Sequence, residues 1–180
     1  MARSECFGTD RNIDMAFHIS VCRNTPEEFK SIASLLISAF VDEGHTDAAH
    51  AGLLTSPTEL QKRGEIFLAR DGSNSGELLG MAILVRPISP ARQVAEADEA
   101  ELHLLAVSTI ARGRGIGAAL TQACEARALA AGFKKMVLST QPTMKAAHHV
   151  YERLGYNRNP ARDWTRANGR SFLVYEKSLT

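Results

Sequence analysis

A glycine-rich turn between a predicted strand and a predicted helix is the feature that most limits what this chain can form. Residues 112–117 read Arg-Gly-Arg-Gly-Ile-Gly, after an apolar strand pattern at 100–107 and before an alanine-rich helical pattern at 115–131. Glycines let a backbone approach a ligand closely and adopt positive φ angles. Because the first N–H groups of the helix point into the turn, and Arg112 and Arg114 add positive charge, the pattern predicts an anion-binding site.

The charge balance restricts the partners of such a site. Lys and Arg number 21 against 20 Asp and Glu, so the formal net charge is only +1. Nucleic-acid-binding domains carry a clear basic excess, so we predict no nucleic-acid partner. No apolar run approaches the roughly 18 residues of a membrane span, so no membrane partner is expected. Cys6, Cys22 and Cys124 lack metal-ligand or redox spacing, which favours reduced thiols in a cytoplasmic protein without a metal site.

Hydrophobic periodicity predicts alternating strands and helices. The expected strands are 17–23, 65–70, 78–86, 100–107, 134–140 and two more within 156–177; the expected helices are 26–40, one or two short pieces within 41–64, 115–131 and 143–154. This order predicts an α/β fold with a mixed sheet and helices on its faces. A chain of 180 residues suits one domain, which we place at 15–180, with a poorly ordered polar tail at 1–14.

The glycine turn by itself is compatible with several ligands. A P-loop requires a Lys after the glycines, and none follows them here. The residues Gly113, Gly115 and Ala118 satisfy a relaxed dinucleotide-binding fingerprint, but five residues separate the strand from the first glycine, and the next strand ends without an acidic residue for a ribose. A tight loop that binds nothing also explains the pattern.

Two motifs together resemble the GNAT superfamily of acetyl-CoA-dependent N-acetyltransferases. The strand at 100–107, four intervening residues and then Arg112-x-x-Gly115-x-Gly117 are similar to its acetyl-CoA signature. The sequence Ala-His-His-Val-Tyr-Glu-Arg-Leu-Gly-Tyr at 147–156 resembles its late helix, and the order of elements over 17–177 also fits. One departure is Met144, which stands where family members often carry Asn, so one side-chain contact to the cofactor is expected to be absent.

The resemblance implies the GNAT fold, with about six to seven strands and about four flanking helices. It also implies that the strand at 100–107 splays away from the strand at 134–140 and opens a V-shaped cleft. Pantetheine then lies along the first strand, and the pyrophosphate of acetyl-CoA lies on the glycine turn. The residues expected to bind acetyl-CoA are Leu105, Ala106, Val107, Arg112, Gly113, Arg114, Gly115, Ile116, Gly117 and Ala118.

Glu101 and His103 are the candidate bases. They are two residues apart on a strand, so their side chains share a face, and regular alternation places Leu105 and Val107 on the same face. The purely structural interpretation makes Glu101 an exposed strand start and His103 a core histidine with satisfied hydrogen bonds. In GNAT enzymes the matching positions often hold the group that deprotonates the amine, so the resemblance implies that one or both do so here, directly or through water.

Acetyl transfer also needs help at the carbonyl oxygen and at the leaving thiolate. A backbone N–H near Leu105 or Ala106 is the expected oxyanion donor. The resemblance implies that Tyr151 is the general acid, whereas the structural alternative is a helix residue packed on the sheet. We therefore expect an enzyme that moves acetyl from acetyl-CoA to a primary amine in a ternary complex. The competing classes are a non-catalytic CoA-binding sensor or interaction module and a nucleotide-dependent oxidoreductase.

The acetyl acceptor stays open, as a small-molecule amine or a protein amine. The resemblance implies that Asp42, Glu43 and Asp47 lie in the region that borders the acceptor site, and Glu96, Asp98 and Glu99 precede the strand at 100–107. If these residues face the cleft they favour a cationic acceptor; a solvated acidic loop is the alternative. Trp164 is expected to pack at the rim of the cleft. A monomer and a homodimer are both compatible with the sequence.

Overall fold

The computed structural model describes residues 17–46, 48–72 and 76–179. The helices are α1 (Pro26–Leu36), the π-helix η1 (Ile37–Asp42), α2 (Ala48–Thr55), α3 (Pro57–Arg63), the 3-10 turn η2 (Thr109–Ala111), α4 (Ile116–Ala130), α5 (Lys145–Arg153) and the 3-10 turn η3 (Pro160–Arg162). The strands are β1 (Phe17–Val21), β2 (Gly64–Asp71), β3 (Leu78–Val85), β4 (Glu99–Val107), β5 (Lys135–Thr140), β6 (Asn157–Arg158), β7 (Trp164–Thr165) and β8 (Ser171–Ser178). The tail at 1–14 lies outside the described residues. Within them, no helix has the length and apolar character that a membrane crossing requires.

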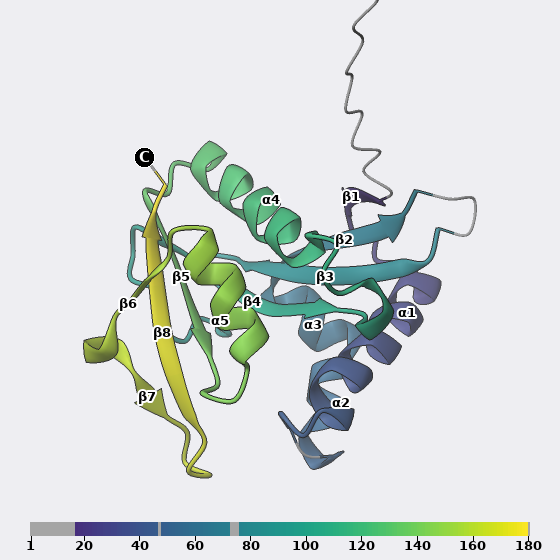
Figure 1. The fold of residues 1–180 in the computed structure, drawn as a ribbon, viewed down its shortest axis with the longest axis horizontal. Coiled ribbons are helices and arrows are strands. Elements are labelled where there is room, and N and C mark those ends of the chain that lie inside the picture. The colour runs from purple at the N-terminus through teal and green to yellow at the C-terminus, as the bar shows by residue number, and fades with distance from the viewer. Residues whose placement is uncertain (1–16, 47, 73–75, 180) are drawn as a thin grey trace, which may run out of the picture.

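The strands form one mixed sheet, as predicted (Figure 1). Across the described residues it has eight strands in the order β1-β2-β3-β4-β5-β8-β6, with β7 paired to β8. Strands β4 and β5 are parallel, and the other neighbours are antiparallel. The strand count slightly exceeds the expected one because β6 and β7 are strands of two residues each.

Helices cover both faces of the sheet (Figure 1). Residues of α4 and α5 pack in one buried cluster, and residues of α1 and α3 pack in a second. Strand β3 serves both, because Ala82 and Leu84 belong to the first cluster while Met81 and Ile83 belong to the second. This alternation is that of a strand buried on both sides, which explains its continuous apolar sequence.

Local sequence signals explain where α1 begins. Thr25 is the N-cap, and its hydroxyl accepts a hydrogen bond from the N–H of Glu28 over 3.2 Å. The Glu28 carboxylate accepts in return from the N–H of Thr25, which completes the capping box. Glu28 also pairs with Arg70 of β2 over 3.5 Å, so the start of the helix is tied to the sheet.

The predicted splay between the two parallel strands is confirmed. The ladder between β4 and β5 joins Glu99–Leu102 to residues 135–138. Beyond Leu102, the described part of β4 stays paired with β3 alone, over His103–Val107. The edge of β4 that faces β5 is therefore left without a strand partner over its second half, where Figure 1 shows the two strands diverging.

A β-bulge interrupts β4 just where the splay begins. His103 lies opposite Ile83, and Ala106 lies opposite Met81. Between these two pairs, β4 contains one more residue than β3. Within this stretch Leu104 has a φ of +50°, a conformation that a residue with a side chain rarely adopts.

The bulge reverses the alternation of side chains along β4. Leu105 and Val107 pack against the cluster that contains Leu102, and not on the face of Glu101 and His103. The prediction that Leu105 and Val107 continue the face of Glu101 and His103 is therefore wrong, because regular alternation holds only in a strand without an inserted residue.

Candidate active site

A buried carboxylate and an imidazole meet where β4 leaves β5. Oε1 of Glu101 lies 2.7 Å from Nε2 of His103. The backbone N–H groups of Gln93, Val94 and Ala95, in the loop before β4, donate to Oε2 of Glu101 over 3.0, 3.3 and 3.1 Å. Glu101 is only 1% exposed, so the interpretation of this residue as an exposed strand start is wrong.

The surroundings of Glu101 keep it ionised. Burial alone raises the pKa of this carboxyl, but the hydrogen bond and charge of His103 and the backbone N–H groups of Gln93 and Ala95 outweigh burial and lower the pKa. A carboxylate that accepts this many hydrogen bonds has little capacity left to take a proton from a substrate. Because it can only accept, its partner Nε2 of His103 carries the hydrogen, which leaves the lone pair of the imidazole on Nδ1.

His103 and Leu104 line a cavity of about 160 Å³ beside the splay. We call it the His103 cavity. Its wall is built from η1, α2, the end of β5 and the β7–β8 hairpin, and it includes the apolar side chains of Phe40, Leu53, Leu54, Met144 and Phe172. His103 itself is 8% exposed. Met144, at the position where the resembled family often carries Asn, thus lines the His103 cavity.

The glycine turn adopts the conformation that its sequence predicts. Gly113 and Gly115 have φ angles of +78° and +79°, in the left-handed region that favours glycine. Gly115 is the N-cap of α4, and an added Cβ at either glycine would meet open space. The N–H groups of the first helical turn therefore point out of the helix end without intrahelical acceptors, which is the arrangement of an anion site.

Gly117 brings the glycine turn and the splayed half of β4 together. A Cβ at Gly117 would lie 3.6 Å from Val107, 3.8 Å from Val150 and 3.9 Å from Leu105. The residues predicted to hold the pantetheine and the pyrophosphate are therefore neighbours in space, with α5 beside them.

The turn after η1 contacts three other segments near the cleft. Glu43 forms an ion pair with Arg112 of the glycine turn. The carbonyl oxygen of His45 accepts hydrogen bonds from Gln141 over 2.7 Å and from Arg170 over 2.8 Å. These contacts connect the turn after η1 to the glycine turn, to the loop after β5 and to the β7–β8 hairpin.

Tyr151 lies apart from the His103 cavity. It is 5% exposed and packs with Tyr156 and Tyr175, at ring-centroid distances of 5.8 and 6.1 Å. Burial, reinforced by nearby Cys124, raises the pKa of its phenol, so the hydroxyl keeps its proton at neutral pH. Tyr151 belongs to the cluster under α4 and α5, next in sequence to Val150, which faces Gly117.

The acidic residues that sequence analysis placed near the cleft do not line the His103 cavity, as far as the structure describes them. Glu43 pairs with Arg112. Glu99 is bound by Arg162 over 2.7 Å and by Lys135 over 3.2 Å; although burial opposes it, these partners lower its pKa to about 2. Asp47 lies outside the described residues. No described carboxylate of this set therefore lines the His103 cavity, but Glu43 lies 3.6 Å from Nε2 of His45, which does.

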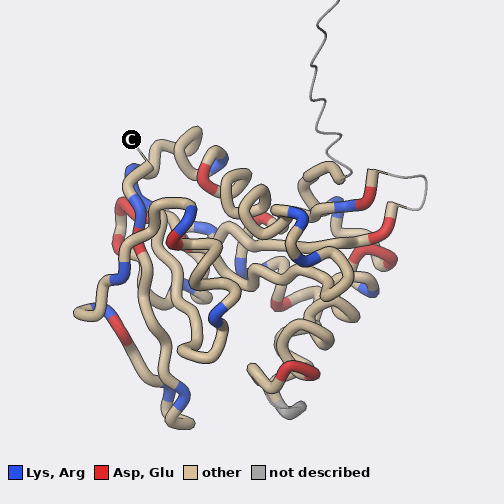
Figure 2. The backbone as a smooth tube through the Cα atoms, in the orientation of Figure 1, with Lys and Arg blue, Asp and Glu red and all other residues tan. Residues whose placement is uncertain are grey.

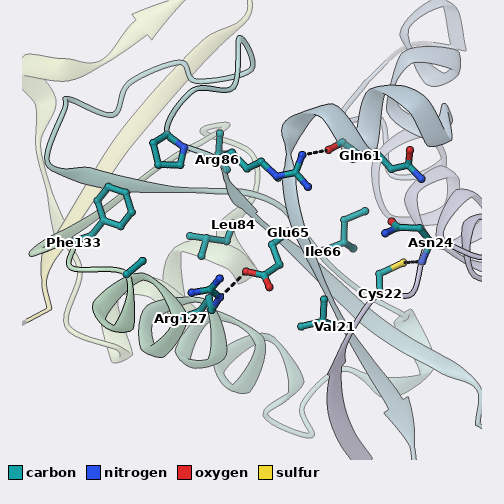
Figure 3. A pocket seen from close by; sticks show the side chains of 14 residues that line it. Val21, Cys22, Asn24, Gln61, Glu65, Ile66, Leu84, Arg86, Arg127 and Phe133 are labelled. Carbon is teal, nitrogen blue, oxygen red and sulfur yellow. Dashed lines mark hydrogen bonds and ion pairs between the residues drawn. The ribbon is translucent and has the colours of Figure 1, made fainter.

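A larger cavity, of about 530 Å³, lies elsewhere, against β2 and the C-terminal end of α4 (Figure 3). Glu65 and Arg127 form an ion pair over 2.8 Å at its wall. Its Cys22 has a pKa raised by burial to about 11, so this thiol is a poor nucleophile. None of the predicted site residues lines it, and the described residues contain no cluster of metal-ligating side chains.

Residues 29–156 match the model of the acetyltransferase (GNAT) family. This chain belongs to the GNAT family. The match begins inside the first helix and spans the splayed strands, the glycine turn and the late helix, so it includes both motifs on which the resemblance rests. No curated protein sequence matches the chain significantly.

Solved GNAT structures share the fold at low sequence identity. An acetyltransferase of the GNAT family from Staphylococcus aureus Mu50 is 17% identical with a TM-score of 0.69, over 92% of this chain and 100% of that chain. Aminoglycoside 6'-acetyltransferase type Ii is 20% identical with a TM-score of 0.65, over 91% and 97%. The ribosomal-protein-S18-alanine N-acetyltransferase of Escherichia coli is 18% identical with a TM-score of 0.61, over 91% and 94%.

The GNAT motifs are contiguous in sequence, but part of the site is not. Arg63, Arg166 and Arg170 also line the His103 cavity, from the end of α3 and from the β7–β8 hairpin. No spacing or motif connects these arginines along the chain, so sequence analysis did not single them out. Trp164, expected to pack at the rim, stacks on Phe172 of the cavity wall, with 4.5 Å between the ring centroids.

Proposed function

We propose that this GNAT protein transfers the acetyl group of acetyl-CoA to a primary amine by direct attack in a ternary complex. The observation that carries the proposal is the position of the Glu101–His103 pair: a charge-oriented imidazole at the wall of a cavity, at the residue where β4 leaves β5. A base, an acceptor cavity and a free strand edge thus coincide at one place.

The residues present fit acetyl-CoA as the donor. The unpaired edge of β4 over His103–Val107 offers backbone groups to the amides of pantetheine, as an added strand does. The glycine turn offers N–H groups to the pyrophosphate, with Arg114 beside it. Gly117 leaves the backbone open between Leu105, Val107 and Val150. When bound, acetyl-CoA supplies an activated acetyl thioester.

His103 acts as the base in this proposal, and Glu101 positions it. An ammonium has no lone pair, so the acceptor must lose a proton before its nitrogen attacks the acetyl carbon. Nδ1 of His103 takes that proton, directly or through water, while the Glu101 carboxylate stabilises the imidazolium that forms. The backbone N–H groups of Gln93 and Ala95, in the loop before β4, keep the Glu101 carboxylate in place during the transfer.

Two groups then act on the other side of the acetyl carbon. As the N–C bond forms and the C–S bond breaks, negative charge moves first to the carbonyl oxygen and then to sulfur. The bulge at Leu104 turns the following backbone, so an N–H of Leu105 or Ala106 is the proposed oxyanion donor. Tyr151, whose raised pKa keeps it protonated, is the proposed acid for the thiolate. The nitrogen loses its second proton as the amide forms, and this proton, passed through water, restores the Tyr151 phenol.

The proposal is tested by turnover with a panel of amines. Purified protein is incubated with acetyl-CoA and amino acids, polyamines, an aminoglycoside or peptides, and both thiol release and the mass of the acetylated product are measured. We expect at least one amine to be acetylated, and the His103→Ala variant to lose that activity. Tight binding of acetyl-CoA without turnover of any amine would instead favour a non-catalytic CoA-binding module.

The cellular setting is part of the same proposal. Cys22 and Cys124 are unpaired and buried, as expected in a reducing compartment, which supports a cytoplasmic location. We expect a small-molecule amine or a protein amine as acceptor, with neither nucleic acid nor membrane as partner, and a monomer or homodimer as the assembly.

A further inference from the structure

The His103 cavity concentrates positive charge. Three of its lining residues are the arginines Arg63, Arg166 and Arg170. Two of its histidines pair with carboxylates, His103 with Glu101 over 2.7 Å and His45 with Glu43 over 3.6 Å, so the excess counted here is that of the arginines. Among the described residues that line it, none is acidic. The chain as a whole is nearly neutral, with a formal charge of +1, so this excess is local. Figure 2 shows positively charged residues at the β7–β8 hairpin, while both signs of charge are scattered over the rest of the described chain.

Arg63, at the end of α3, is held in the cavity wall without a full set of partners. Its Nε is buried and has no hydrogen-bond acceptor. Burial lowers the pKa of its guanidinium and the charge of Arg166 lowers it further, while the charge of Glu59 opposes them without reversing the shift. A buried donor without an acceptor costs free energy, so the site gains stability from any group that supplies one.

Arg166 is oriented by aromatic rings instead of by a carboxylate. Its guanidinium carbon lies 4.9 Å from the ring centre of Phe172 and 5.6 Å from that of Trp164. Burial and the charge of Arg170 lower its pKa. Stacking fixes the plane of this guanidinium without neutralising it, which leaves its N–H groups available in the plane for an anion.

The same chain neutralises comparable arginines elsewhere. Arg162 pairs with Glu99 over 2.7 Å and with Glu176 over 3.3 Å. Arg158 pairs with both carboxylate oxygens of Asp163 over 2.9 and 2.7 Å. The contrast with Arg63 and Arg166 indicates that the cavity is built to receive a negative charge from outside the chain.

We propose that the acetyl acceptor carries a carboxylate or phosphate on the same small molecule as its primary amine, and that Arg63 and Arg166 bind this anionic group while His103 faces the amine. This inference rests on the proposed acetyl transfer. A volume of about 160 Å³ holds roughly five water molecules and so suits a small acceptor, and Phe40, Leu53 and Leu54 provide an apolar wall for its side chain. Polycationic acceptors are disfavoured by repulsion.

Matched acceptors test the charge directly. We compare leucine with leucinamide and phosphoethanolamine with ethanolamine, with spermidine as a polycation, and measure kcat/KM by thiol release at constant ionic strength. Loss of charge-assisted hydrogen bonds is expected to lower kcat/KM about tenfold or more in at least one pair, and that pair identifies carboxylate or phosphate as the anion. Equal rates in both pairs, or a preference for spermidine, would overturn the inference.

Variants connect the preference to the two arginines. Arg63→Gln and Arg166→Gln are expected to lower kcat/KM for the anionic acceptor about tenfold, mainly through KM, and to lower it clearly less for the uncharged acceptor. Arg166→Lys keeps the charge and is expected to retain part of the preference. Arg23→Gln removes an exposed arginine outside the cavity and serves as the control. A preference that survives both Gln variants in folded protein would contradict the assignment.

A binding measurement separates this inference from the catalytic proposal. N-acetylleucine, the product analogue, is expected to raise the melting temperature of the wild-type protein more than N-acetylleucinamide does, and Arg63→Gln and Arg166→Gln are expected to remove the difference. If this holds although no amine is acetylated, the anion site stands and the proposed acetyl transfer fails. If amines are acetylated without any charge preference, the inference fails and the proposed function stands.

Discussion

The Glu101 carboxylate lies 2.7 Å from Nε2 of His103, on the strand that ends at the cleft, and three backbone N–H groups hold it from the other side. In the proposed reaction, the pair divides the base's task, which the sequence left open, between two residues. Glu101 has no free position for a substrate proton, whereas His103 borders the cavity. The following predictions test this division and the elements around it.

His103→Ala is expected to reduce kcat/KM by roughly 10²–10⁴, the range of general base catalysis, with little change in the affinity for acetyl-CoA. Imidazole added to the assay is expected to restore part of the rate, because it replaces the missing base. Glu101→Gln keeps the shape but cannot accept from Nε2 as an anion does, so kcat is expected to fall less. Turnover that is normal in both variants and in the double variant would show that the amine loses its proton to solvent.

Tyr151→Phe keeps the ring contacts with Tyr156 and Tyr175 and removes only the proton donor. If Tyr151 protonates the leaving thiolate, kcat is expected to fall roughly 10²-fold, with KM for acetyl-CoA and melting temperature little changed. An acyl donor with a more acidic thiol needs less help, so the loss is expected to shrink for it.

The matched control for this variant is Tyr175→Phe, which removes a hydroxyl from the same aromatic cluster. That hydroxyl donates to Glu152 over 3.4 Å and has no assigned part in the reaction. Normal turnover is expected for Tyr175→Phe. Equal losses in both variants, or normal turnover of Tyr151→Phe, would return Tyr151 to a purely structural role.

Among the glycines of the turn, Gly117 is expected to affect the affinity for acetyl-CoA and Gly115 the folding stability. Gly117→Val adds bulk between Leu105, Val107 and Val150, so acetyl-CoA affinity measured by calorimetry is expected to fall about tenfold. Gly115→Ala forces a side chain into φ +79°, and is expected to cost about 1 kcal/mol of folding stability. Gly52→Ala, in α2 with open space around it, is the control and is expected to be neutral or slightly stabilising. Acetyl-CoA binding by Gly117→Val at the wild-type level would refute the cofactor site.

Acid is expected to weaken the fold partly through Glu99. Its pKa is lowered from the ordinary value of 4.5 to about 2 because Arg162 and Lys135 hold the ionised form against the effect of burial. The stabilisation is therefore complete above about pH 4.5 and is lost as the pH falls towards 2. Urea unfolding at pH 7 and pH 3 measures this loss.

The variant Glu99→Gln is expected to be less stable than wild type at pH 7 and to lose less stability on acidification. Glu59→Gln provides the comparison, because Glu59 forms an exposed pair with Lys62 over 3.0 Å, and such pairs contribute little. A pH dependence of Glu99→Gln identical to that of wild type would exclude the Glu99 pair as a source of acid sensitivity.

Several features of the fold were predictable because their causes are local. The capping box of Thr25 and Glu28, the Ser56 N-cap of α3 and the left-handed glycines at 113 and 115 each depend on a few consecutive residues. The side-chain alternation of β4 was not predictable, because the bulge at Leu104 depends on its register with β3. For the same reason, the burial of Glu101 beneath residues 93–95 carries no signal in the strand itself.

The sequence alone determined the family, the mixed sheet, the glycine turn and the two candidate bases, Glu101 and His103, because these follow from contiguous motifs and from periodicity. Only the tertiary structure decided that backbone N–H groups hold the Glu101 carboxylate while His103 lines a cavity, and that Arg63 and Arg166 line the same cavity. Arg63 ends α3 and Arg166 follows β7, and only the packing of the sheet and its helices brings them to one place. Charge acts through space and not along the chain, so the chemistry of the acceptor site depends on contacts that local patterns do not encode.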